Sequence, residues 1–211
     1  MSDPDELLDA FDDALRPLGP FTRDDVHRLG LWHQVFHCLV VRTEAPARVL
    51  LQRRPRTARS FAGLLDLSTT GHLTSGERPV DGVREIAEEI GVSATAEQLI
   101  PLGRRLMVDD SGEGRNREIV HAFLLPLDLP LDAFDIGLCD VDGLVEIETS
   151  ALSQILADPN AIVTCDELGM DGAVHHRGCS AADLVPTTDG YWTLIAIMAE
   201  RFVAGRHPLA I

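Results

Sequence analysis

Three glutamates between residues 71 and 92 have the spacing that places carboxylates together on one face of a helix. An α-helix repeats every 3.6 residues, so Glu85 lies beside Glu88 and Glu89 one turn later. Three like charges at this separation repel one another unless a cation lies between them, and oxygen ligands favour Mg²⁺ or Mn²⁺. The spacing therefore predicts a divalent-metal site on one face of a helix.

The residues around these glutamates indicate where the helix begins, how it packs and where it ends. Pro79 favours a helix start, and Gly91 favours a helix end, which predicts a helix over about residues 80–90. The apolar side chains of this stretch project to the opposite side, where they can be buried: Val83, Ile86, Ala87 and Ile90. One face of the helix packs, and the other carries the charges.

The same segment resembles the Nudix box, in which a glycine and a glutamate precede an Arg-Glu-apolar-any-Glu-Glu-any-Gly-apolar run. Gly71, Glu77 and residues 84–92 match this pattern, with one departure: six residues instead of seven separate Glu77 from Arg84. The missing residue falls before the metal-binding turn, so we expect it to alter the loop more than the carboxylates. The resemblance covers roughly residues 27 to 148.

The resemblance implies a metal-dependent hydrolase that acts on a nucleoside diphosphate derivative or a similar small diphosphate, with Mg²⁺ or Mn²⁺ as the cofactor. It also implies an α/β (α+β) fold, the Nudix-type α/β/α sandwich with a mixed β-sheet. Carried over residue by residue, the metal ligands are Glu85, Glu88 and Glu89 with the carbonyl oxygen of Gly71. Arg84 then orients the carboxylates, with Glu77 as its ion-pair partner. Metal charge and a positioned water lower the barrier to attack on an anionic diphosphate.

Three further residues are candidates with a second interpretation each. Glu118 is a metal ligand or general base by the resemblance, or else an outward-facing strand carboxylate. Arg54 places a guanidinium on the diphosphate or forms a surface salt bridge, and Arg53 points to the opposite face of a regular strand. His72 lines the site or is a loop histidine bonded to the backbone.

The surrounding sequence is also similar to type I isopentenyl-diphosphate isomerase, along residues 50–54, 61–64 and the Gly71-His72 pair. Those isomerases bind a metal with histidines and glutamates, and four residues fall at or near the corresponding places: His27, His33, His72 and Glu118. The isomerase needs a cysteine before the Gly-His pair, where this chain has Thr70, and a hydroxyl is a far weaker acid than a thiol. Thr70 and the intact box favour phosphate chemistry, with isomerase activity and a non-catalytic nucleotide-binding module as the alternatives.

Composition excludes other classes of function. A net charge of −16 disfavours a nucleic-acid-binding surface, which requires clustered positive charge. The acidic N-terminus and the lack of a long apolar run argue against a signal peptide or a membrane span, so we expect a cytoplasmic protein. Four cysteines without a C-x-x-C pair indicate buried free thiols. The expected partner is a small-molecule diphosphate, and a homodimer is an open alternative.

Hydrophobic patterns predict one Nudix domain over residues 1–211, with a helical cap over about residues 1–30 that contains a helix at 5–15. We expect strand hairpins at 35–41 with 48–54 and at 98–107 with 117–125, the second joined by a loop at 109–116. Further predicted elements are an extended segment at 64–70, a strand at 143–147, and helices at 150–156 and 191–203. The pattern assigns no element to residues 157–190.

Overall fold

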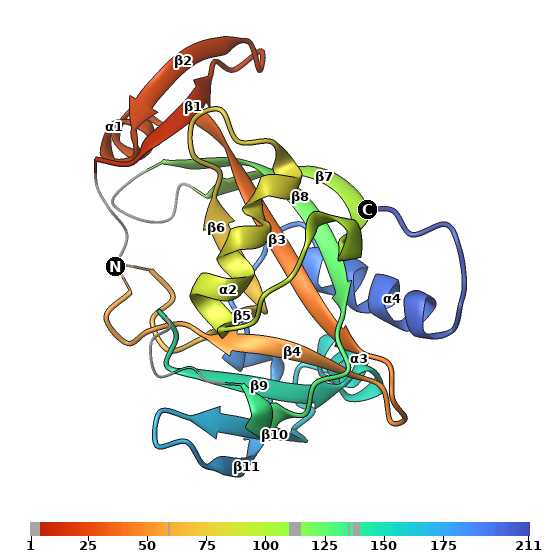
Figure 1. Ribbon diagram of the computed structural model, residues 1–211. Helices are drawn as coiled ribbons and strands as arrows, with labels where there is room; N and C mark the ends of the chain where they lie inside the picture. The colour runs from red at the N-terminus through yellow and green to blue at the C-terminus, as the bar shows by residue number, and fades with distance from the viewer. Residues whose placement is uncertain (1–4, 59, 110–114, 135, 137–139) are drawn as a thin grey trace.

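The computed structural model describes residues 5–58, 60–109, 115–134, 136 and 140–211, and its core is a mixed β-sheet (Figure 1). The main strand order is β11-β10-β9-β4-β3-β1-β2, with β5 paired to β4, β6 and β8 paired to β3, and β7 paired to β8. The strands are β1 (Leu7–Phe11), β2 (Pro17–Thr22), β3 (Trp32–Arg42), β4 (Arg48–Arg53), β5 (Leu65–Leu67), β6 (Thr69–His72), β7 (Ile100–Asp109), β8 (Asn116–Pro126), β9 (Gly143–Glu148), β10 (Val163–Gly169) and β11 (Val174–Cys179). The α-helices are α1 (Arg23–Leu29), α2 (Arg84–Ile90), α3 (Thr149–Ala157) and α4 (Tyr191–Val203).

Strand β3 is the central strand of the sheet, since it pairs with four other strands, and it is buried on both faces. It runs parallel to β8 and antiparallel to β4, β6 and β1. Its apolar side chains alternate between two separate clusters, with Val35 and Leu39 in one and Phe36 and Cys38 in the other. A strand covered on both sides has an almost continuous apolar sequence, which is what residues 35–41 contain.

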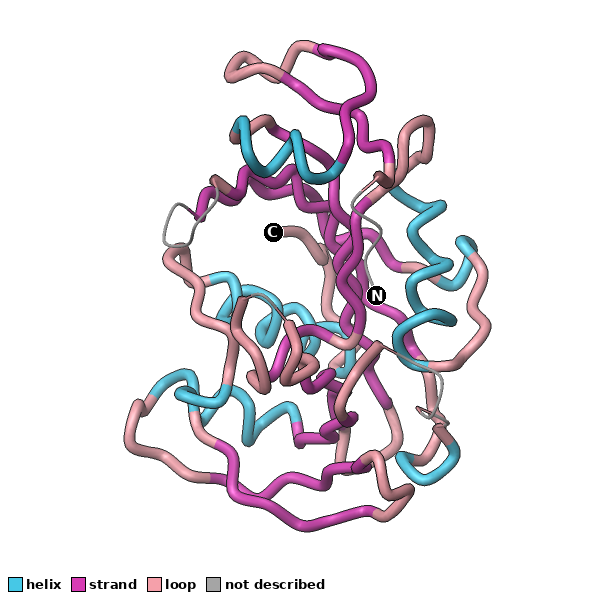
Figure 2. Tube along the Cα trace, turned by 90° about the vertical axis from the view of Figure 1, so that its left-hand side faces the viewer, coloured by secondary structure: helices cyan, strands magenta, loops and turns pink. Residues whose placement is uncertain are grey.

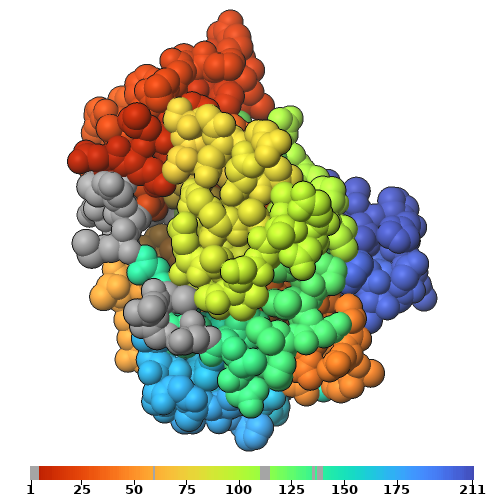
Figure 3. Space-filling model, in the orientation of Figure 1, coloured from red at the N-terminus to blue at the C-terminus, as the bar shows by residue number. Residues whose placement is uncertain are grey.

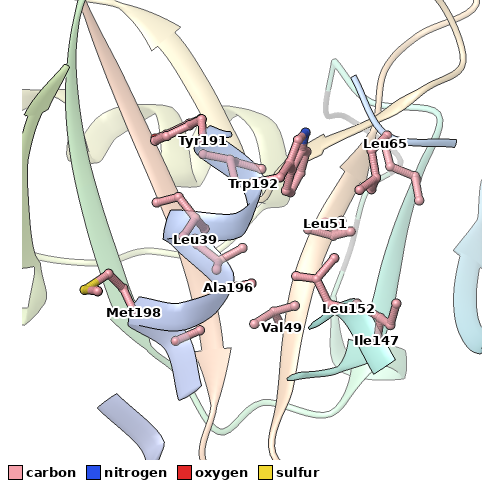
Figure 4. Packing of buried hydrophobic residues seen from close by; sticks show 14 of the residues in the cluster. Leu39, Val49, Leu51, Leu65, Ile147, Leu152, Tyr191, Trp192, Ala196 and Met198 are labelled. Carbon is pink, nitrogen blue, oxygen red and sulfur yellow. The ribbon is translucent and has the colours of Figure 1, made fainter. Parts of the chain in front are cut away.

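Helices cover both faces of this sheet (Figure 2). Helix α2 packs through Ile86 and Ile90 against the cluster that contains Phe36, and its segment lies at the centre of the face shown in Figure 3. On the other face α4 packs against β3 and β4, where Trp192 and Ala196 lie near Leu39 and Val49 (Figure 4). The structure thus confirms the predicted α/β/α arrangement with a mixed sheet.

The prediction of an N-terminal helix at residues 5–15 is wrong. The chain forms a hairpin of β1 and β2 instead, and α1 follows it. Leu8 and Ala10 are buried on one face of β1 while Leu7 is exposed, which is a period of two. The leucines of residues 5–15 also fit a helical period, but the chain forms a strand here because β1 pairs with both β2 and β3.

Most other elements are confirmed within a few residues, with two differences near the centre and the end of the chain. The predicted helix at 80–90 begins as a 3₁₀ turn, Pro79–Val83, before α2, and Ala87 is exposed rather than packed. The unassigned stretch 157–190 contains the antiparallel pair β10 and β11. Cys38, Cys165 and Cys179 are buried free thiols as expected, whereas Cys139 and most of the expected loop at 109–116 lie outside the described residues.

The 3₁₀ turn approaches β3 so closely that only glycine fits at position 82. A Cβ built on Gly82 would lie 2.6 Å from Cβ of Phe36. We therefore expect Gly82→Ala to lower the free energy of unfolding by about 1–3 kcal/mol, since the core must shift to admit the methyl group. Urea unfolding measures this change.

Gly178→Ala is the matched control, because a Cβ there would approach only the exposed Ile162 side chain, at 3.1 Å. Equal unfolding midpoints for wild type and Gly82→Ala would contradict this description of the contact.

Candidate functional site

Arg84, the first residue of α2, joins the groups around the predicted metal site. Its Nε donates to Oε1 of Glu77 at 2.8 Å, and its Nη1 donates to Oε1 of Glu85 at 2.7 Å and to Oε2 of Glu88 at 3.3 Å. Its Nη2 donates to the carbonyl oxygen of His72 at 2.9 Å. The expected ion pair between Arg84 and Glu77 is thus present, and it raises the pKa of the guanidinium.

Glu85 is buried against the backbone of β6. A Cβ added to Gly71 would lie 2.0 Å from Cδ of Glu85, so glycine at this position makes room for the carboxylate. Burial raises the pKa of Glu85 from 4.5 to about 7, and Arg84 opposes part of this shift. The charged form of this carboxyl group is therefore only partly compensated by its protein neighbours.

Glu89 is held by the same strand. Its Oε2 accepts a hydrogen bond from the backbone N–H of Thr70 at 2.7 Å and another from Nε2 of Gln52 at 3.0 Å. Burial nevertheless raises the pKa of Glu89 well above its ordinary value, with the Glu85 charge adding to the shift. Glu88 differs from both, because its side chain is 58% exposed and turns toward Arg84.

The carboxylates of Glu85 and Glu89 offer oxygen ligands for a metal ion. Mg²⁺ keeps several of its waters and binds through one or two carboxylates plus phosphate oxygens, so Glu85 and Glu89 suffice as a protein ligand set. Glu88 instead accepts a hydrogen bond from Nη1 of Arg84 at 3.3 Å.

Three histidines lie close enough together to bind one metal ion. His27 of α1, His33 of β3 and His72 of β6 each offer a nitrogen, and these atoms lie within 4.8 Å of one another. The ring centroids are 4.9 to 5.3 Å apart. The Nδ1 of His33 lies 3.2 Å from the carbonyl oxygen of Leu31, which fixes its Nε2 as the free lone pair.

The histidine cluster has the chemistry of a set of metal ligands. Burial lowers the pKa of His33 to about 3 and that of His72 well below its ordinary value, so both rings are neutral at pH 7. In the described part of the chain the buried Nε2 atoms of His33 and His72 have no hydrogen-bond partner. Neutral imidazoles with free lone pairs suit Zn²⁺, Mn²⁺ or a similar divalent ion.

Glu118 and Arg54 are two further charged groups near the site. The register of β8 on β3 places Glu118 beside His33, and its Oε1 accepts a hydrogen bond from Nδ2 of Asn116 at 2.7 Å. Burial raises the pKa of Glu118 to about 7, which argues against the interpretation as an ordinary outward-facing carboxylate. Arg54 is bound to Asp66 at 2.9 Å, and both charges act on Glu118 and on Glu89.

Several polar residues near this site were not predicted as functional. Gln52 and the Thr70 amide hold Glu89, and their roles depend on pairing between strands that the sequence does not show. His37, Arg105 and Tyr191 form a second polar group that has no motif. Arg53, by contrast, lies on the other face of β4 as expected, where it pairs with Glu167.

Among the described helices, none combines the length and the apolar composition that crossing a bilayer requires.

Comparisons with known proteins agree with this geometry. A family model of the NUDIX domain matches residues 31–159. A Clostridium acetobutylicum protein named as an uncharacterised Nudix hydrolase is 35% identical over 153 residues, which cover 72% of this chain and 74% of the relative. An isopentenyl-diphosphate Delta-isomerase of Serratia proteamaculans is 34% identical over 94 residues, or 44% of this chain and 50% of the isomerase.

A crystal structure from Deinococcus radiodurans shares the fold, with a TM-score of 0.54 at 19% identity over 72% of this chain and 90% of that chain. The family match covers more than half of the sequence and includes the segment with Arg84 and its carboxylates. It confirms the prediction of an enzyme of this type. The chain belongs to the Nudix hydrolase family.

Proposed function

We propose that the protein hydrolyses a phosphoanhydride bond in a small diphosphate, such as a nucleoside diphosphate derivative, with the help of a divalent cation. The observation that supports this most directly is the arrangement of Arg84, Glu85 and Glu89 against Gly71 and Thr70. Glu85, which is buried, and Glu89, which is half-buried, both have raised pKa values and fixed hydrogen-bond donors, and such carboxylates are suited to receive Mg²⁺ or Mn²⁺.

The bound cation would neutralise the diphosphate oxygens and lower the pKa of a coordinated water. Arg84 keeps Glu85 oriented through a direct hydrogen bond, and the Thr70 amide and Gln52 do the same for Glu89. Gly71 leaves the space that Glu85 occupies and offers its carbonyl oxygen as a further ligand. These residues position the metal, and Arg84 contributes through the carboxylates.

Glu118 is our candidate for the general base. Its pKa of about 7 suits a group that accepts a proton at neutral pH. In the proposed step the oxygen of water forms a bond to phosphorus, the bridging P–O bond breaks, and the water proton passes to the carboxylate of Glu118. The charge of Arg54 acts on both Glu118 and Glu89. Arg54 is paired with Asp66, and its guanidinium would bind phosphate oxygens if the substrate replaced Asp66 as its partner.

Substitution of these two carboxylates tests the assignment. We expect Glu85→Gln and Glu89→Gln to lower kcat by at least about 100-fold on the best diphosphate substrate, because an amide binds Mg²⁺ poorly and adds no negative charge. Release of phosphate from a panel of nucleoside diphosphates, nucleotide sugars and ADP-ribose measures this. Glu97→Gln, which changes an exposed carboxylate in the 3₁₀ turn Ala96–Gln98, serves as the control. Wild-type rates in both site variants would refute the proposal.

Metal binding should depend on pH because Glu85 must lose its proton first. The folded pKa is raised from 4.5 to about 7, so without metal the stability falls as pH rises through this window, since the unfolded chain ionises more easily. Mg²⁺ binds the ionised form and reverses this loss. We expect millimolar Mg²⁺ to raise Tm by roughly 2–5 °C at pH 8 and much less at pH 5.5.

Thermal unfolding with and without Mg²⁺ at the two pH values measures this effect. A shift that is as large at pH 5.5 as at pH 8 would exclude Glu85 as a ligand.

A second candidate function is isomerisation of isopentenyl diphosphate, which the histidine cluster favours because, by the resemblance, its residues fall at or near the metal-binding places of those isomerases. Against it stands Thr70, whose hydroxyl replaces the thiol that the proton transfer needs. We therefore expect no allylic isomer from isopentenyl diphosphate. Detection of that isomer with wild-type enzyme would establish the second candidate.

The cluster itself is tested by metal content. We expect wild-type protein dialysed against Zn²⁺ or Mn²⁺ to retain about one ion per chain at the three histidines, and His33→Asn to lose it, since a neutral imidazole is replaced by a weak ligand. Mass spectrometry of bound metal measures the ratio. His176→Asn is the control, because that ring is 81% exposed on β11. Equal metal content in all three proteins would show that His33 is not a ligand.

A further inference from the structure

The N-terminal hairpin lies outside the segment that the family model matches, which begins at residue 31. Strands β1 and β2 pair with each other, and with α1 they bury a small apolar cluster of their own that contains Leu8, Ala10 and Val26. Two residue pairs join β1 to β3. The hairpin is therefore an addition with its own core, and its contacts with the domain indicate what it contributes.

The loop that follows β6 lies against this hairpin (Figure 1). Thr74 forms a β-bridge with Leu8, and the backbone N–H of Ser75 donates to the carbonyl oxygen of Leu7 at 2.7 Å. The two segments are also in contact on the face shown in Figure 3. The loop thus follows the backbone of β1 before it turns toward the 3₁₀ turn and α2.

Asp9 of β1 holds the same loop with both of its carboxylate oxygens. The Oγ of Ser75 donates to Oδ1 at 2.7 Å, and the backbone N–H of Gly76 donates to Oδ2 at 3.0 Å. Gly76 has φ of 88°, a left-handed conformation that glycine adopts without strain. An ionised acceptor forms stronger hydrogen bonds than a neutral one, so Asp9 restrains this turn at two successive residues.

The turn that Asp9 holds also carries Glu77. The backbone N–H of Thr74 donates to Oε2 of Glu77 at 2.7 Å, and the backbone N–H of Glu77 donates to the carbonyl oxygen of Thr74 at 3.0 Å. The turn therefore fixes both the backbone and the carboxylate of Glu77. That carboxylate accepts from Nε of Arg84 at 2.8 Å, and Arg84 donates in turn to Glu85.

The shortened box gives the contact with Asp9 a physical role. Six residues separate Glu77 from Arg84, one fewer than in the box pattern. A shorter connection has fewer backbone conformations that bring the Glu77 carboxylate to the guanidinium. Because Asp9 restrains the loop at residues 75 and 76, less conformational entropy is lost when the ion pair of Glu77 and Arg84 forms. The hairpin thus helps to preorganise the group that orients Glu85.

Building on the proposed function, we propose that Asp9 is a positioning residue of the metal site. It holds the turn at residues 74–77 against β1 and so orients Glu77, which orients Arg84 and, through it, the carboxylate of Glu85. The N-terminal hairpin is then a functional part of the active site and not only a cap on the domain.

The dependence of hydrolysis on Mg²⁺ concentration tests this assignment. Asp9→Ala removes both hydrogen bonds to the turn and leaves the carboxylates of the box in place. We expect it to raise the Mg²⁺ concentration for half-maximal activity roughly tenfold, because residues that orient metal ligands affect metal affinity by this order. At saturating Mg²⁺, kcat should come within about threefold of wild type, since the reacting groups are unchanged.

Asp128→Ala is the matched control. Asp128 likewise accepts hydrogen bonds from a hydroxyl and from backbone N–H groups, which belong to Thr43 and Glu44 in the turn after β3. Loss of these contacts can lower Tm, but the Mg²⁺ requirement should match wild type. An unchanged requirement in Asp9→Ala, or an equal rise in Asp128→Ala, would overturn the assignment.

Asp9→Asn is the conservative variant, because its amide can accept from the Gly76 N–H and donate to the Ser75 hydroxyl. It should restore the wild-type Mg²⁺ requirement. A requirement as high as that of Asp9→Ala would overturn the role of these two hydrogen bonds.

A double-mutant cycle with Glu77→Gln tests whether Asp9 acts through Glu77. In the Glu77→Gln protein the ion pair with Arg84 is already lost, so we expect Asp9→Ala to raise the Mg²⁺ requirement further by less than about twofold. Full additivity of the two effects would contradict the proposed path from Asp9 to Glu85.

Thermal unfolding at pH 8 separates this proposal from the proposed function. If wild type cleaves none of the diphosphates, the rise in Tm caused by Mg²⁺ still compares wild type, Asp9→Ala and Asp128→Ala. A smaller rise in Asp9→Ala alone supports the role of Asp9 without hydrolysis. Equal rises in the three proteins, or no rise in wild type, overturn it.

Unfolding without Mg²⁺ verifies that Asp9→Ala is folded. If it is not, Ser75→Ala replaces it, because this change removes one of the two hydrogen bonds from an exposed position. A smaller rise in the Mg²⁺ requirement, of roughly two- to fivefold, is then expected. A wild-type requirement in Ser75→Ala would overturn the assignment.

Discussion

The hydrogen bonds of Arg84 are the interaction on which the rest of the site depends. One guanidinium contacts Glu77, Glu85, Glu88 and the backbone of β6, so it fixes the position of α2 relative to the strand that carries Gly71 and His72. Arg84 also opposes part of the pKa shift that burial causes in Glu85. Arg84 therefore offsets the repulsion among the acids that surround it, two of which, Glu85 and Glu88, it contacts directly.

The parts of the fold that the sequence predicted are those whose patterns are local. Helix α4 has the predicted bounds because Tyr191 to Val203 is a continuous apolar helix pattern, and Gly91 ends α2 with φ of 71° as a glycine does. The hairpin of β10 and β11 was not predicted because its sequence is polar. Ion pairs with distant residues stabilise it, including Arg48 with Asp166 and Arg53 with Glu167, and no local pattern reveals them.

The same distinction between local patterns and tertiary contacts applies to the candidate site. The box residues follow from their spacing on one helix, although the sequence gives no sign that Glu88 turns to Arg84 while Glu85 and Glu89 are held by β6. The histidine cluster follows only in part, since family resemblance located His72 more firmly than His27 and His33. Their meeting depends on the packing of α1 beside β3 and β6, which is a tertiary property. Arg105 has no motif, and its stacking on Tyr191 depends on the packing of the start of α4 beside β7.

The metal-binding geometry of Glu85 and Glu89 is the central claim, and a crystal structure with Mg²⁺ and a non-hydrolysable nucleoside diphosphate analogue tests it most directly. The account predicts that oxygens of both carboxylates lie about 2.0–2.1 Å from an ion that also contacts the diphosphate. It further predicts that Arg84 keeps its contact with Glu77. A structure in which the diphosphate and its ion contact only the histidine cluster, with Glu85 and Glu89 free of metal, would contradict it.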